Sequence, residues 1–235
     1  MQAFWNGELS FSEGIVVYRG LSADNSQHAH ATLQITVSGT DPITLQDELG
    51  AHHSGQAIYV RPGVKHALFA KSEITLILIE PQSALAAASL SEFPAADIGL
   101  LSEPLRSIIT DDKSPSAIMS ELKRFALPHD APLDERLAAA MELLKEVPLK
   151  NAIQRVATHC GLSESRLRAI AQKQLGIPLS KWLLWCAIAR AGQATADGKS
   201  LVQAAMIGGF SDQAHYTRTV RKLLGVTPGQ TRHLF

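Results

Sequence analysis

Residues 207–228 read IGGFSDQAHYTRTVRKLLGVTP, and the earlier residues 161–178 read GLSESRLRAIAQKQLGIP. From Gly209 in one and Gly161 in the other, both run through an apolar residue, serine, an acidic residue and a helical stretch to Leu-Gly, an apolar residue and proline. A short helical pattern precedes each copy, and the serine can accept free backbone N–H groups as an N-cap. A short helix, a glycine turn and a second helix make a helix-turn-helix, so the repeat predicts two such units.

Helical phase predicts which side chains of the two second helices are exposed, because apolar residues at helical spacing face the core. The exposed face of the first copy carries Ser165, Arg166, Arg168, Ala169, Gln172 and Lys173, and that of the second carries Gln213, Ala214, Arg218, Arg221 and Lys222. A major groove accepts such a helix, and Arg reads guanine and Gln reads adenine by paired hydrogen bonds. Either helix alone could be an ordinary solvated surface, but two copies favour DNA recognition.

The distribution of charge supports this interpretation. The chain has 235 residues, 22 basic and 22 acidic, and its formal charge is zero. Residues 1–130 nevertheless hold 8 Lys/Arg and 15 Asp/Glu, whereas residues 131–235 hold 14 and 7. Opposite charges on the two halves indicate two different tasks, and the basic half supplies attraction to phosphate.

From about Asp134 to Phe235 the sequence resembles the AraC/XylS family of bacterial transcription regulators, most specifically over residues 207–228. The resemblance implies two helix-turn-helix units joined by a long linker helix, residues 179–196, which places two helices in successive major grooves. The family's base-contact positions fall on Ser165, Arg168, Ala169, Gln213, Ala214 and Arg218, with Arg166 or Gln172 assisting in the first helix. Ala169 departs from the long polar residue often found there and can offer only an apolar contact. Phosphate contacts are expected from Lys181, Arg221 and Lys222, RNA polymerase is the expected partner of an activator, and a homodimer is a further expectation.

The amino-terminal half has a β texture. Short β-branched runs from Ile15 to Ile79, separated by turn residues, predict an antiparallel barrel or sandwich. Helical patterns follow at residues 83–90, 98–109 and 114–125, and then only helices are expected, over residues 134–146, 152–159, 163–175, 179–196, 200–207 and 211–224, with a final turn after Thr227. The predicted fold is therefore two-domain α+β. Its parts are a sensing barrel at 1–81, a helical dimerisation or relay segment at 82–127 and a DNA-binding domain at 131–235, with the boundary in the linker-like residues 128–132.

Histidines in the barrel form a candidate metal site. His28, His30 and Gln34 alternate so that they share one face of a strand, and His66 follows the turn at residues 61–63. Three imidazoles and an amide oxygen could hold a divalent metal. The pattern resembles the cupin barrel, with Gln34 where that family usually has Glu, and Gly20 two residues too far from His28.

Two functions of different classes remain open. The first is a transcriptional regulator whose barrel binds a small-molecule effector, in a pocket with walls at Ile35, Val37, Tyr59 and Phe69. The alternative is a metal-dependent cupin enzyme, an oxygenase or isomerase, fused to a DNA-binding module. The regulator is favoured because no carboxylate completes the metal set, and no catalytic residue is assigned. A DNA-alkylation repair regulator would need a cysteine methyl acceptor near four-thiolate metal chemistry, which Cys160 and Cys186 cannot supply.

The two cysteines exclude a disulfide framework and favour a reducing compartment. No uncharged apolar run approaches the roughly 20 residues that span a bilayer. The sequence therefore predicts a cytoplasmic protein with double-stranded DNA, and no membrane, among its partners.

Overall fold

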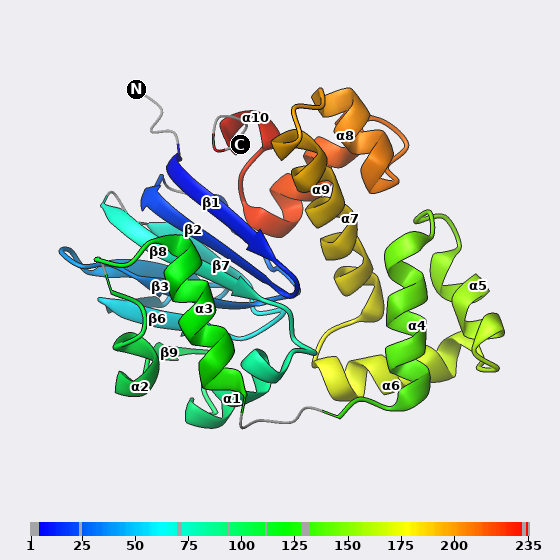
Figure 1. The fold of residues 1–235 in the computed structure, drawn as a ribbon, viewed down its shortest axis with the longest axis horizontal. Coiled ribbons are helices and arrows are strands. Elements are labelled where there is room, and N and C mark those ends of the chain that lie inside the picture. Colours follow the sequence, from blue (N-terminus) through cyan, green and yellow to red (C-terminus); the bar gives the residue numbers. More distant parts are fainter. Residues whose placement is uncertain are drawn as a thin grey trace.

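The computed structural model describes residues 5–23, 25–69, 72–93, 95–110, 112–127, 132–231 and 234. Its amino-terminal part combines antiparallel sheets with a few helices, and the elements described after Pro132 are helical (Figure 1). The strands are β1 Asn6–Ser12, β2 Ile15–Leu21, β3 Leu33–Val37, β4 Ile43–Asp47, β5 His52–Gly55, β6 Ala57–Val60, β7 His66–Phe69, β8 Glu73–Ile79 and β9 Ile98–Leu100. The two-domain α+β class predicted from the sequence is confirmed.

The strands form two sheets and not a closed barrel. One sheet has the order β1-β2-β8-β3-β6-β9, and the other has the order β5-β4-β7. Every pairing between these strands is antiparallel, and outside them an isolated bridge joins His28 to His66. No strand ladder within the described residues joins β1 or β9 to the three-stranded sheet, so the prediction of a barrel is wrong as regards closure.

The helices are α1 Ala84–Glu92, α2 Glu103–Arg106, α3 Pro115–Ala126, α4 Glu135–Glu146, α5 Ala152–His159, α6 Glu164–Leu175, α7 Leu179–Ala196, α8 Leu201–Gly208, α9 Gln213–Leu224 and α10 Pro228–Thr231. The helix expected over residues 98–109 is wrong, because Ile98–Leu100 pairs with β6 as an edge strand and only a single helical turn, α2, follows. Of the boundary predicted at 128–132, residues 128–131 lie outside the described residues.

The two faces of the six-stranded sheet have different neighbours. Alternate residues of its central strands, among them Val17, Ile35 and Ile77, pack against α1 and α3 in one apolar core. Ile35, Val37 and Tyr59 belong to this core, and Phe69 is exposed, so the four residues expected to line an effector pocket do not line the cavity between the two domains. Strand alternation tells which residues share a face but not which face meets the effector.

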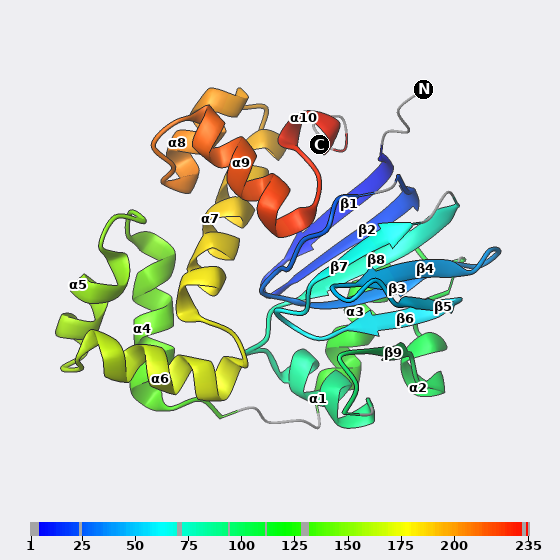
Figure 2. The same ribbon diagram turned by 180° about the vertical axis from the view of Figure 1, so that it is seen from behind.

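The helical domain lies against the opposite face of the sheet (Figure 2). Ala31 and Leu78 of the sheet domain share a core with α4 to α7, and Val226, just after α9, packs in a core with Tyr18 and Leu68. The sheet therefore contacts the helical domain at two places, one near α4–α7 and one at the end of α9. No described helix is both long enough and apolar enough to span a bilayer.

Candidate DNA-binding surface and interdomain pocket

Helices α5 and α6 form the first predicted unit. Gly161 turns the chain with a φ of 65°, and the Ser163 hydroxyl accepts the Arg166 backbone N–H at 3.2 Å as the N-cap of α6. The buried face of α6 consists of Leu167, Ile170, Ala171 and Leu175. The predicted base-contacting side chains of this helix are all exposed: Ser165, Arg166, Arg168, Ala169 and Gln172.

Helices α8 and α9 correspond to the second predicted unit. Ser200 and Gln203 make the expected capping box on α8, and Gly209 turns the chain with a φ of 85°. The N-cap of α9 is Asp212, whose carboxylate accepts the His215 N–H at 2.6 Å, so the expectation of a serine cap here is wrong. Asp212 caps the helix in place of Ser211 because a carboxylate is the stronger acceptor at a helix N-terminus. The predicted DNA-facing side chains Gln213, Ala214, Arg218, Arg221 and Lys222 are all exposed.

The arginines on the two exposed faces differ in whether they form an ion pair. The Arg168 guanidinium forms an ion pair with Glu164 one turn earlier, with 2.6 Å between Nη2 and Oε1. Arg218 forms no hydrogen bond or ion pair with any residue that the structure describes. Lys181 is half-buried, and its charge helps to lower the pKa of His30, so it lies near the sheet domain. In Figures 1 and 2, α6 and α9 lie at opposite ends of α7.

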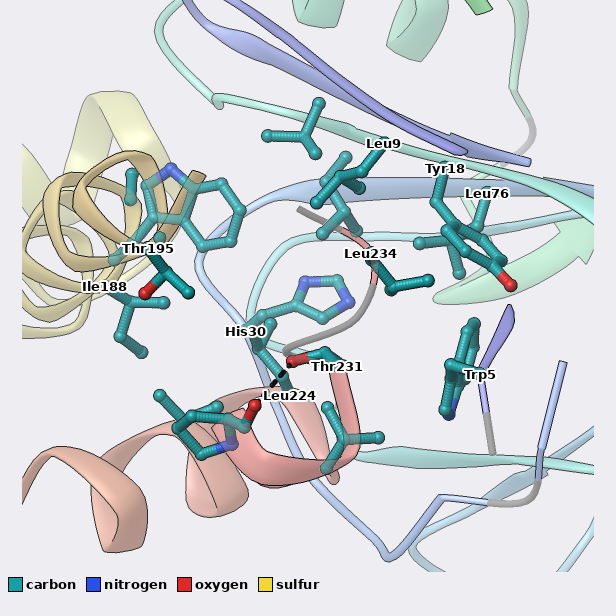
Figure 3. Close-up of a pocket in the computed structure, with 18 of the residues that line it drawn as sticks. Trp5, Leu9, Tyr18, His30, Leu76, Ile188, Thr195, Leu224, Thr231 and Leu234 are labelled. Atoms are coloured by element: carbon teal, nitrogen blue, oxygen red, sulfur yellow. Dashed lines mark hydrogen bonds between the residues drawn. The ribbon is translucent and has the colours of Figure 1, made fainter. Parts of the chain in front are cut away.

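A cavity of about 150 Å³ lies between the sheet and the helical domain. Figure 3 shows side chains from both domains converging on it. The sheet domain contributes Tyr18, Leu76 and His30, and the helical domain contributes Ile188 of α7 and Leu224 of α9. The cavity is thus at the domain interface and not inside a barrel. No local pattern in the sequence indicates this cavity, because its walls come from segments some 200 residues apart.

His28, His30, Gln34 and His66 come together as predicted, and the first three of them line one side of this cavity. All four side chains are at most 4% exposed, and donor atoms of the three histidines lie within 4.8 Å of one another. His28 and His30 precede β3, so the expectation that they lie on one strand with Gln34 is wrong; Gln34 lies on β3 and His66 begins β7. Burial lowers the pKa of His28 to about 3 and lowers the pKa values of His30 and His66 as well, so the imidazoles are neutral at pH 7.

The donor atoms of this cluster fit a divalent cation. Each Nδ1 contacts a backbone carbonyl oxygen, at 2.9 Å in His28 and His30 and 3.0 Å in His66. A neutral imidazole that donates from Nδ1 presents a lone pair at Nε2, which is how second-shell carbonyls orient metal-binding histidines. The Nε2 atom of His66 then faces the Gln34 amide oxygen at 3.2 Å, which places an acceptor against an acceptor. The Nε2 atom of His30 lies 2.9 Å from the same oxygen and meets it as an acceptor when Nδ1 donates to Thr32 O, or as a donor when Nδ1 accepts from the Thr32 hydroxyl. A cation bound by these atoms would remove the repulsion between acceptors. Without a cation, exchanging the O and N positions of the Gln34 side-chain amide would let its NH2 group donate to both rings.

Comparison with known proteins agrees with the helical domain. Residues 156–233 match the family model described as a helix-turn-helix domain. This match confirms the resemblance of the carboxyl-terminal part to AraC/XylS regulators. Among proteins with curated functions, none matches the chain.

Solved structures resemble the whole chain. ToxT from Vibrio cholerae O395 is 11% identical, with a TM-score of 0.55 over 95% of this chain and 98% of that one. Wild-type ToxT of V. cholerae strain SCE256 with bound unsaturated fatty acid is 10% identical, with a TM-score of 0.56 over 98% and 97%. An AraC-type regulator from Chromobacterium violaceum is 28% identical, with a TM-score of 0.39 over 42% and 90%. The likeness to ToxT shows that the chain has this two-domain fold.

Proposed function

We propose that this protein is a sequence-specific, DNA-binding transcriptional regulator controlled by a ligand at the interface of its two domains. The observation that carries the proposal is the pair of exposed, cation-bearing helices α6 and α9 at the two ends of α7, in a domain that matches a helix-turn-helix family. Two such units in one chain can enter successive major grooves, which are about 34 Å apart.

The side chains divide by role. Gln213 and Arg218 read bases from α9, with Ala214 beside them, while Arg168 reads from α6 with Ser165, Arg166, Ala169 and Gln172 around it. Arg221 and Lys222 contact phosphates, which position the protein without selecting a sequence. Lys181 remains the weakest member of the phosphate group because it is half-buried.

The ligand acts through the cavity between the domains. Residues from β2, β8, α7 and α9 line this cavity, so an occupant touches the sheet and the second helix-turn-helix unit at once. A ligand with different affinities for two domain arrangements shifts the population between them. An engineered protein cavity of comparable volume takes up benzene, so a small and mostly apolar molecule suits this one. The proposal also includes a division of the chain into a sensing domain at 1–81, a helical segment at 82–127 and a DNA-binding domain at 131–235. The protein acts in the cytoplasm as a homodimer, and RNA polymerase is its protein partner.

The histidine cluster would hold a divalent cation with His28, His30, His66 and Gln34 as ligands. Such a cation supplies positive charge that polarises whatever it binds. The same four ligands would also serve the alternative function, a metal-dependent enzyme. Oxygen uptake or isomerisation by the metal-loaded, untagged protein would favour that alternative.

The proposal is tested by incubating the full chain with fragmented genomic DNA and sequencing what it retains. We expect one recurring bipartite motif whose halves are about one helical turn apart. Retention of DNA with no common sequence, with equal affinity for all fragments, would overturn the regulator assignment. The genes beside the recovered sites would point to the effector.

A further inference from the structure

The end of helix α9 is attached to the sheet domain beside the histidine cluster. The carbonyl oxygen of Gly225, the residue that ends α9, accepts hydrogen bonds from both the backbone N–H and the hydroxyl of Ser26, each at 3.1 Å. Val226 then enters the apolar core that contains Tyr18 and Leu68. The helix that carries Arg218 is therefore held at its carboxyl end by the sheet domain.

Only glycine fits at this attachment. Gly225 has a φ of 71°, in the left-handed region, and a Cβ there would lie 2.5 Å from the Ser26 oxygen and 2.8 Å from His28 Nδ1. Gly176, which ends α6, has the same backbone conformation with a φ of 72°, yet its Cβ would meet nothing within 4 Å. The two glycines share the helix-ending role, but only Gly225 also makes the close approach between domains.

The segment that holds Gly225 also holds the histidines. The Ser26 carbonyl oxygen lies 2.9 Å from His28 Nδ1, and the His28 backbone exchanges two hydrogen bonds of 2.9 Å with His66. Asn25 anchors the other end of the segment, because its side-chain oxygen accepts the Leu68 N–H at 2.7 Å. Residues 25–28 thus touch Gly225 on one side and carry a candidate metal ligand on the other.

We propose that residues 25–28 couple the histidine cluster to α9, so that a divalent cation bound by His28, His30 and His66 stabilises the docked position of α9. This inference rests on the proposed function and specifies how its ligand site is regulated. A cation bound at Nε2 of His28 makes its Nδ1–H a stronger donor to the Ser26 carbonyl. Such a hydrogen bond to a backbone carbonyl is the usual outer contact of a metal-binding histidine. Cation binding and docking order the same four residues, so each reduces the entropic cost of the other. By linkage, the coupling factor is the same in both directions.

The test measures Co²⁺ binding to the full, untagged chain by its d–d absorption, in the wild type and in the Gly225→Ala and Gly176→Ala variants. Both substitutions place alanine in a left-handed conformation, so both carry the same local strain. We expect Gly225→Ala to weaken Co²⁺ binding by at least about fivefold, the lower end of typical coupling between sites, and Gly176→Ala to leave it within about twofold. A wild type that binds no Co²⁺, or two variants that bind it equally tightly, would overturn the proposal.

A second measurement separates coupling from a direct clash of the new methyl group with His28. Amide hydrogen exchange of the wild type is compared with and without Co²⁺. We expect Co²⁺ to slow exchange in residues 25–30 and also in residues 226–231, while residues 164–175 of α6 stay unchanged. Protection confined to residues 25–30 refutes the coupling. Neither experiment involves DNA, so a chain that selects a DNA motif but fails here keeps its proposed function and loses only this mechanism.

Discussion

Replacing Arg218 by alanine tests whether α9 reads bases. Arg218 is exposed on α9 and forms no hydrogen bond or ion pair with the described residues, so no such bond within the described part of the chain has to be broken before it binds DNA. A bidentate arginine–guanine contact discriminates by about 1–3 kcal/mol, which corresponds to a loss of roughly 5- to 150-fold in affinity for the preferred sequence. The loss should be confined to one base position, because each arginine reads one base pair.

The assay is a set of dissociation constants on the selected sequence, on single-base-pair variants of it and on random DNA, each at two salt concentrations. Lys222→Ala is the matched control on the same helix, expected to weaken all sequences alike and to reduce the salt slope by about one unit. Arg168→Ala should lose slightly less than Arg218→Ala, because Arg168 must first leave Glu164, an exposed helical pair worth about 0.3–0.5 kcal/mol. If Arg218→Ala weakens the selected and random sequences equally, the base-reading role of Arg218 is refuted.

Three further predictions follow from single contacts. Glu164→Gln releases Arg168 and removes a negative charge near phosphate, so DNA affinity should rise about twofold; unchanged or weaker binding in a filter assay would contradict this. In protein treated with a chelator, the free energy of unfolding should fall as the pH drops from 6.5 towards 3, because unfolding lets the buried, neutral His28 take up a proton. From the His28 pKa of about 3, the decrease by pH 5 is about 2 kcal/mol, which urea titrations can measure. The His28→Gln variant should show a shallower decrease, and an unchanged decrease would contradict this assignment. Trp185→Phe removes the 3.1 Å hydrogen bond from the indole N–H to Glu80 across the domain interface and should lower the free energy of unfolding by about 1–2 kcal/mol, whereas a change confined to the noise of denaturation curves would mean that this contact contributes nothing.

The helical domain is predicted well because its signals are local. Apolar spacing placed α6 and α9 to within a residue or two, and the capping box on α8 was visible in the letters. The failures involve competition between local and distant partners. Residues 98–100 have a helical pattern but pair with the edge of β6 as a strand. Helix α9 is capped by Asp212 and not by the neighbouring Ser211.

The candidate site divides in the same way. His28, His30 and Gln34 lie close together in the sequence, so local spacing is enough to predict that they meet. His66 comes from β7 in the other sheet and is joined to His28 by an isolated bridge, and only the resemblance to the cupin pattern indicated that it belongs to the cluster. The interdomain cavity could not be predicted from the sequence, and Ile35, Val37 and Tyr59, which were expected as pocket walls, belong instead to the core with α1 and α3. Alternation along a strand separates two faces without telling which of them a later domain will cover.

The sequence by itself determined the helix pairs α5–α6 and α8–α9, the identity of the exposed side chains on α6 and α9, and the grouping of His28 and His30 with Gln34. These depend on periodicities and caps that act over a few residues. Only the tertiary structure decided that the helical domain packs on the sheet, that the cavity lies between the two, and that Gly225 ends α9 against Ser26 and His28. Those contacts join residues about 200 positions apart, and their free energy comes from burying surfaces whose partners no local pattern specifies.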